Sequence, residues 1–244
     1  MESTSPPELS RRAFLALLAG LAAAGAGCSV PGTSPGSLLR RSSFGEQLFK
    51  TDVDHYIEAS QRRIFVSLRR LTEKLYRRNP REWRKTAPSL EEALVHIFDV
   101  DHSWRLASLG NRRNIEALTL AFAPEFRGDR VQALMVGMSS MIQSAFGDMV
   151  GFYVLNDLSP QGFYNAARNV EVAAWKLGTV RDEYGELLLL SNEMGEINNL
   201  SFEREMGRII GILEALSDLL EIKTERMVIR VVQGVATAAF LPIP

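Results

Sequence analysis

The fold is decided by one stretch, DRVQALMVGMSSMIQSAFGDMVGFYVLN, residues 129–156. Small residues recur in it at steps of three and four, which is the spacing of one face of an α-helix. They are Gly137, Ser140, Ser144, Gly147 and Gly151. The other faces carry large side chains: Leu134, Met138, Met141, Ile142, Phe146 and Met149. A helix that is apolar nearly all round is buried among its neighbours. We therefore expect a mainly α, multi-helix bundle around a buried small-residue helix at about 129–156.

The composition is that of a globular protein. Of the 244 residues, 46% are apolar and 23% are charged, which suffices for one domain with a sizeable core. The charge is distributed unevenly, because residues 29–85 carry 13 Lys and Arg against 6 Asp and Glu, whereas residues 86–244 carry 13 against 21. We expect these two parts to attract one another. The single cysteine excludes an intramolecular disulfide.

The N-terminal region has the layout of an export signal. The pair Arg11 and Arg12 precedes 15 uncharged residues, Ala13–Gly27, and then Cys28. A membrane span needs roughly 20 apolar residues, so this run is too short to be one. The arginine pair, with the serine before it and the Phe-Leu after it, resembles a twin-arginine (Tat) signal. The sequence Gly25–Cys28 resembles the lipoprotein box of bacteria.

This resemblance implies a domain organisation and a cellular address. Residues 1–27 would be removed, and Cys28 would become the lipidated first residue of a tether, residues 28–43, that is rich in Ser, Gly and Pro. Residues 44–244 would form a single α-helical domain. Several acyl chains together give stable membrane anchoring. Ser29 resembles the residue found at this place in lipoproteins of the outer membrane, so we expect the domain at its periplasmic face.

A second cleavage site remains open. Ala24-Gly25-Ala26 fits the A-x-A rule for ordinary signal cleavage. Cleavage there would release a soluble periplasmic protein with a free Cys28.

A long amphipathic helix is predicted from about Asp52 to Arg78, ended by Asn79-Pro80. Three arginine pairs repeat about every two turns beside its apolar face: Arg62, Arg63, Arg69, Arg70, Arg77 and Arg78. We name these six residues the arginine strip. The strip would contact anionic lipid headgroups or an acidic envelope polymer, at about 1 kcal/mol per residue near a charged membrane. Alternatively, it is a solvated face neutralised by the acidic remainder of the chain. An exported protein is not expected to bind nucleic acid.

The tetrapeptide Asp-Val-Asp-His occurs twice, at residues 52–55 and 99–102. Its Asp-x-x-His spacing resembles the carboxylate and histidine spacing of metal-binding helical bundles. Both copies, however, stand where we expect a helix to begin, and aspartate at such a place is ordinarily an N-cap. We therefore predict no metal site.

The densest polar group beside an apolar run lies on a helix expected from Ser159-Pro160 to about Leu177. Together with a carboxylate of the central helix, its members are Asp148, Asn165, Arg168, Asn169 and Glu171. The spacing places Asn165 with Asn169, and Arg168 with Glu171, on shared faces. A carboxylate in an apolar helix needs a partner, and Arg168 is the first candidate for Asp148. The group would line a ligand pocket or form a structural buried network.

Further elements follow from start signals and periodicity. Helices are expected at 89–98, opened by the capping box Ser89–Glu92, at 103–122 and at 202–223. A short β-hairpin is predicted at about 179–191, and the apolar run 227–241 should be buried. The small residues of the central helix would also suit pairing of membrane helices, although its glutamines oppose that interpretation.

The sequence contains no nucleotide-binding loop, nucleophile elbow or pair of zinc ligands, so we predict no catalytic residue and no cofactor. Our leading hypothesis is a membrane-anchored envelope lipoprotein that acts as a non-enzymatic interaction or assembly module, with envelope proteins or anionic lipids as partners. The alternative is a periplasmic binding module or carrier for a lipid or apolar ligand. A third hypothesis is an enzyme that uses Asp148, Glu171 and Arg168.

Overall fold

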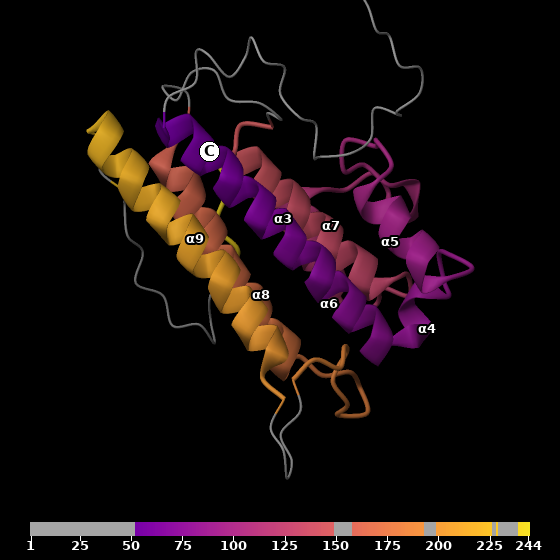
Figure 1. The fold of residues 1–244 in the computed structure, drawn as a ribbon. Helices are drawn as coiled ribbons and strands as arrows, with labels where there is room; N and C mark the ends of the chain where they lie inside the picture. The colour runs from indigo at the N-terminus through magenta and orange to yellow at the C-terminus, as the bar shows by residue number, and fades with distance from the viewer. Residues whose placement is uncertain (1–51, 149–157, 193–198, 226–227, 229–238) are drawn as a thin grey trace, which may run out of the picture. The chain divides into compact units, whose positions relative to one another are not determined.

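The computed structural model describes residues 52–148, 158–192, 199–225, 228 and 239–244, which all lie in one compact unit, residues 36–244. This part of the chain is mainly α, as predicted (Figure 1). Its helices are α3 (Asp52–Arg78), α4 (Pro80–Trp83), α5 (Leu90–Phe98), α6 (Asn114–Phe122), α7 (Arg130–Ala145), α8 (Pro160–Thr179) and α9 (Ser201–Thr224), with a short 3-10 helix at Ala107–Leu109. The predicted export signal, Cys28 and the tether lie outside the described residues.

The central helix α7 is buried along its whole length, as its sequence predicts. Every residue of α7 except Ser144 is buried. Its bare face packs against α6, and a Cβ added at Gly137 would lie 2.6 Å from the backbone nitrogen of Leu118. On the same face, the Ser140 hydroxyl accepts a hydrogen bond from the Asn114 backbone N–H at 2.6 Å. The small residues therefore let the two helices approach closely.

The helix is shorter than predicted, because it ends at Ala145 rather than continuing towards residue 156. The chain turns there through left-handed φ angles of 71° at Gly147 and 54° at Asp148. The Gly147 N–H bonds to the carbonyl of Ser144 at 2.9 Å, and the Asp148 N–H bonds to that of Gln143 at 3.0 Å, as in a Schellman motif. Residues 149–157 lie outside the described part. None of the described helices is long and apolar enough to cross a bilayer.

Two helix pairs and α3 make up the bundle. Helix α6 packs on α7, α8 packs on α9, and α3 contacts both α7 and α9 (Figure 1). The predicted apolar face of α3 is buried at Ile57, Ile64, Leu68, Leu71 and Leu75. Where α8 meets α7, the rings of Phe146 and Phe163 pack edge to face with their centroids 4.8 Å apart. One hydrophobic core therefore joins the long helices.

Capping residues set the predicted helix starts. The Ser89 hydroxyl accepts the Glu92 N–H at 3.1 Å, which confirms the predicted capping of α5. Ser159 caps α8, whose first residue is Pro160, and α9 covers the helix predicted at 202–223. The starts of α5 and α8 are local, since each depends on residues within one turn of the cap, whereas α9 begins without a side-chain cap.

The prediction of a helix at 103–122 was wrong for its first half, because α6 begins only at Asn114. Trp104 adopts a positive φ of 60°, and its ring stacks on Phe65 with centroids 6.0 Å apart. Burial of this indole against α3 stabilises a turn where a helix was expected. The second Asp-Val-Asp-His copy therefore follows the end of α5 and does not begin a helix, contrary to our expectation.

The predicted β-hairpin at 179–191 is reduced to a turn with a single antiparallel bridge, between Arg181 and Leu187. The Asp182 carboxylate organises the turn by accepting the N–H groups of Tyr184 and Glu186 at 2.9 and 3.0 Å. Farther along, the backbone of Leu190 bonds instead to the side chain of Asn79. This contact draws the second half of the expected hairpin away from the first, and the described residues contain no regular strand.

The close approach of α6 and α7 yields a matched pair of substitutions. Gly137→Ala is expected to lower the free energy of unfolding by about 1–3 kcal/mol, because its methyl group would meet the backbone of Leu118. Gly211→Ala on the exposed face of α9 meets nothing within 4 Å. It should raise the free energy by roughly 0.5–1 kcal/mol through helix propensity. Urea unfolding of both variants tests this, and equal effects would contradict the packing described.

Candidate functional site

Two asparagines on α8 hold the end of the chain. Asn165 and Asn169 lie one helical turn apart, on the shared face that their spacing predicts. Asn169 binds the backbone of Leu241 twice, since its Nδ2 donates to the carbonyl at 2.7 Å and its Oδ1 accepts the N–H at 2.6 Å. Asn165 Nδ2 donates to the carbonyl of Pro242 at 2.7 Å. We call these two side chains the asparagine clamp.

The segment in the clamp, residues 239–244, has no regular secondary structure. None of its six residues is fully buried, although Phe240 and Ile243 pack against the hydrophobic core. The clamp bonds only to backbone atoms of the segment. Its hydrogen bonds therefore place no requirement on the side chains of the segment that it holds, apart from the space that they occupy.

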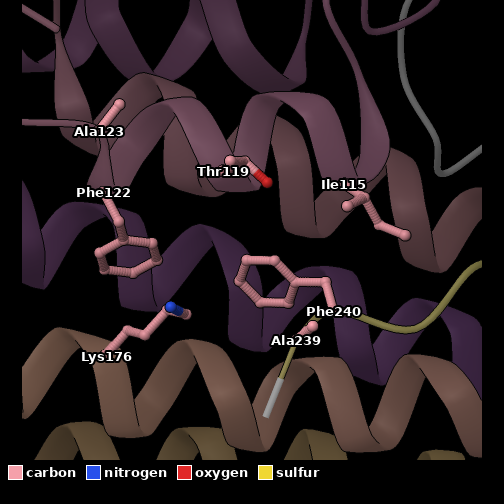
Figure 2. Close-up of a pocket in the computed structure, with 7 residues that line it drawn as sticks. All are labelled: Ile115, Thr119, Phe122, Ala123, Lys176, Ala239 and Phe240. Carbon is pink, nitrogen blue, oxygen red and sulfur yellow. The ribbon is translucent and has the colours of Figure 1, made fainter. Parts of the chain in front are cut away.

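An apolar pocket of about 410 Å³, open to solvent on one side, adjoins this segment (Figure 2). Helix α6 and its end, α8 and the C-terminal segment supply the lining: Ile115, Thr119, Phe122, Ala123, Lys176, Ala239 and Phe240. Figure 2 shows the Lys176 side chain extending from α8 towards the rings of Phe122 and Phe240. The volume lies within the range of about 300–1,000 Å³ that is usual for small-molecule pockets. We call it the α6–α8 cavity.

Lys176 carries the only charge among the residues that line the α6–α8 cavity. Its ammonium lies 5.8 Å from the centroid of the Phe240 ring, within the range of a cation–π contact. It forms no ion pair with any carboxylate in the described part of the chain. The cavity thus combines an apolar surface with a single cation.

The predicted polar group is divided between two places. Asp148 pairs with Arg113 at 2.5 Å, so the proposed Asp148–Arg168 pair was wrong. The reason is the early end of α7, which leaves Asp148 exposed in the turn beyond it and not on an apolar helix face. Arg168 instead pairs with Glu171 at 2.6 Å, as their spacing predicts, and also with Glu214 of α9.

Burial raises the pKa of Glu171, and the charge of Glu214 raises it further, while Arg168 lowers it in part. The Arg168 guanidinium therefore lies between two carboxylates and joins α8 to α9. Such a bridge is a structural network, which is one of the two interpretations that the sequence left open for this polar group. The structure does not place Asp148 beside it, so the three residues of the enzyme hypothesis do not converge.

A polar cluster that the sequence did not reveal lies at the buried N-terminus of α7. Asp129 caps the helix by accepting the Gln132 N–H at 2.9 Å, and it also accepts the hydroxyls of Tyr76 and Thr86 at 2.9 and 3.0 Å. Glu82 of α4 accepts the backbone N–H of Arg130 at 2.8 Å. Burial raises the pKa of Asp129. Burial also raises the pKa of Tyr76, and the negative charge of Asp129 raises it further.

The Arg130 side chain completes this cluster by capping the neighbouring helix. Its guanidinium donates to the carbonyls of Ala121 and Ala123 at 2.8 Å each, and to that of Phe126 at 2.7 Å. These are the carbonyls at and beyond the end of α6, which lack partners within that helix. Burial lowers the pKa of Arg130. Every bond described for these groups stabilises the fold.

A second, charged depression of about 580 Å³ opens beside this cluster, between α4, the loop after α6 and the turn at Asp182. Glu82 and Arg130 both contribute to its lining. The Glu82 carboxylate is already bonded to Lys85 at 2.8 Å and to Arg81 at 3.3 Å. Because the Glu82 carboxylate is already paired and the Arg130 guanidinium is bonded to backbone carbonyls, neither is free to bind a ligand, which makes the depression a weaker candidate than the α6–α8 cavity.

The arginine strip runs along α3, where most of its members pair with nearby carboxylates. Arg69 bonds to Asp99 at 2.9 Å, and Arg70 bonds to Glu205 of α9 at 3.0 Å. Within α3, Arg77 pairs with Glu73 and Arg62 with Glu58. The pairs with Asp99 and Glu205 favour a face neutralised by the acidic remainder of the chain, and the other two pairs neutralise the strip from within α3. Contact of Arg63, Arg78 and the rest of the strip with an anionic surface stays a prediction.

Both tetrapeptides lie within the described residues. This part of the chain contains no group of three or more His, Cys, Asp or Glu side chains that could hold a metal ion. Asp52 and Asp54 lie in the first turn of α3. His102 accepts the Trp104 N–H at 3.0 Å through Nδ1, so its Nε2 donates to the carbonyl of His96 at 2.9 Å. This histidine stabilises the turn after α5.

Comparison with known proteins adds no family, since no protein-family model, no curated protein and no solved structure matches the chain. The clamp and the α6–α8 cavity must therefore be interpreted from their own geometry. Sequence spacing identified both asparagines of the clamp. It missed Lys176, Phe122 and Phe240, because these come from three separate parts of the chain and share no local pattern.

The buried carboxylate of Asp129 makes stability depend on pH. Its pKa in the folded state lies above the ordinary value of 3.8, so its contribution to stability is present below that pH and is lost as the pH rises through the folded-state pKa. Asp129→Asn removes this titration. Measured by urea unfolding between about pH 3.5 and 7, the stability of the native chain relative to this variant should fall as the pH rises. Parallel pH profiles would contradict the assignment.

Proposed function

We propose that this chain is a Tat-exported lipoprotein, anchored through an acylated Cys28, whose helical domain acts as a non-enzymatic interaction module at the periplasmic face of the outer membrane. The resemblance of its first 28 residues to a Tat signal and a lipoprotein box supports the address. The asparagine clamp supports the interaction part of the proposal, because its side chains bond to the backbone of Leu241 and Pro242 and would bond in the same way to the backbone of a partner segment.

The clamp has the properties of a recognition surface for such a segment. Asn169 pairs with both the carbonyl and the N–H of one residue, and Asn165 bonds to the next carbonyl. Main-chain hydrogen bonds of this kind supply affinity in peptide recognition, while side-chain pockets supply specificity. Ala239 and Phe240 of the segment line the α6–α8 cavity, so a partner segment in their place would present its own side chains to the same α6 and α8 surface.

The chain's own C-terminal segment occupies the clamp, and a partner segment would exchange with it. None of the residues 239–244 is fully buried, and three side-chain hydrogen bonds hold the backbone of Leu241 and Pro242. Each such bond contributes only about 0.5–1.5 kcal/mol net. A partner segment whose side chains fit better can therefore replace the C-terminal segment.

Photocrosslinking in the native host tests this proposal. A photoreactive residue at Gln161, one turn before Asn165 on α8, is expected to crosslink the same envelope proteins repeatedly. Asn169→Ala should weaken these crosslinks, and deletion of residues 239–244 should strengthen them by vacating the clamp. A photoreactive residue at the exposed Glu91 of α5 is the control, and circular dichroism checks that each variant is folded. Crosslinks that do not respond to either change would contradict the proposal.

The α6–α8 cavity favours a second candidate function, the binding of a small apolar ligand. Its volume and its lining fit such a ligand, and two aromatic rings face it. In this case the domain would act as a carrier at the membrane and not only as a partner for proteins.

A further inference from the structure

The lining of the α6–α8 cavity separates apolar from polar groups. Ile115, Phe122, Ala123 and the two residues of the C-terminal segment provide the apolar surface, and none of the seven lining residues is acidic. The polar groups are the ammonium of Lys176 on α8 and the hydroxyl of Thr119 on α6. A surface of this kind matches a ligand with a long apolar part and one polar end.

The polar end that fits is an anion. The ammonium of Lys176 lies 5.8 Å from the centroid of the Phe240 ring and has no carboxylate partner among the described residues, and a ring is a weaker partner for a cation than a carboxylate. In Figure 2 Thr119 lies on α6, across the cavity from α8, with its hydroxyl above the Phe240 ring, whereas the Lys176 ammonium lies below the Phe122 ring. An anion beside Lys176 would therefore receive a charge-assisted hydrogen bond from the ammonium.

The half-buried position of Lys176 strengthens this preference. Lys176 is only partly exposed, and the apolar lining lowers the local dielectric constant, so an anion gains more there than on an open surface. A cationic headgroup would be repelled by the same ammonium. A neutral headgroup would leave the ammonium on Phe240 without an anionic partner.

We propose that the α6–α8 cavity binds an anionic amphiphile of the long-chain carboxylate class, with the carboxylate at Lys176 and the acyl chain against Phe122 and Phe240. This inference rests on the second candidate function, ligand binding, and names its ligand class. The geometry that carries it is the juxtaposition of two aromatic rings and one cation that has no carboxylate partner among the described residues, around a single cavity.

Calorimetric titration with three matched twelve-carbon probes tests the proposal. The full mature chain, residues 28–244 with Cys28→Ser so that no lipid is attached, is titrated below the micellar concentration with dodecanoate, 1-dodecanol and dodecyltrimethylammonium. Dodecanoate is expected to bind most tightly. Lys176→Met keeps the apolar stem but removes the charge, and it should weaken dodecanoate binding by about three- to tenfold while leaving dodecanol binding nearly unchanged.

Two further variants locate the effect. Lys223→Met removes an exposed lysine at the end of α9, outside the cavity lining, and should not change dodecanoate binding. Thr119→Trp fills the cavity from an exposed position of α6 and should abolish the binding of all three probes. Circular dichroism and the melting temperature show whether each variant is folded.

The possible outcomes separate the two claims. If dodecanol or the cationic probe binds at least as tightly as dodecanoate, the ligand class is wrong while ligand binding itself stands. If dodecanoate binds but Lys176→Met and Lys223→Met behave alike, the assignment to this cavity is wrong. If none of the probes binds to the folded chain, both the ligand class and the carrier function fail.

Discussion

The buried N-terminus of α7 is the constraint on which the rest of the structure depends. A helix with almost no exposed residue cannot leave its first N–H groups to water, so protein groups must accept them. Asp129 and Glu82 do this, and Arg130, the first residue of the helix, extends the same cluster to the end of α6. One cluster thereby fixes α4, α6 and α7 relative to one another. Two turns farther along the same face of α7, Gly137 permits the close contact with α6 that this arrangement requires.

Side chains also bond to unpaired backbone groups where irregular segments meet the bundle. Asn79 binds the carbonyl and N–H of Leu190, and Asn169 binds those of Leu241. In both cases one amide side chain satisfies a backbone segment that has no strand partner. At Asn169 the segment also forms a wall of the α6–α8 cavity, so recognition of a polypeptide and recognition of an apolar ligand would share one face of α8.

Local signals made much of the fold predictable. The arginine-rich α3, the capped starts of α5 and α8, and the periodic α9 all follow from residues close in sequence. Long-range contacts account for the errors. Packing of Trp104 on α3 replaced the first half of an expected helix, and the turn at Gly147 moved Asp148 away from Arg168. For the site, spacing found both asparagines of the clamp but could not show that the chain's own end lies in it.

We propose that this domain works at a membrane, to which the acylated Cys28 anchors the mature chain. Intact and tryptic mass spectrometry of the protein from the membrane fraction of its native host tests this most directly. The account predicts a mature chain that begins at an acylated Cys28. A chain that begins at Gly27, with a free cysteine thiol and in the soluble fraction, would contradict it.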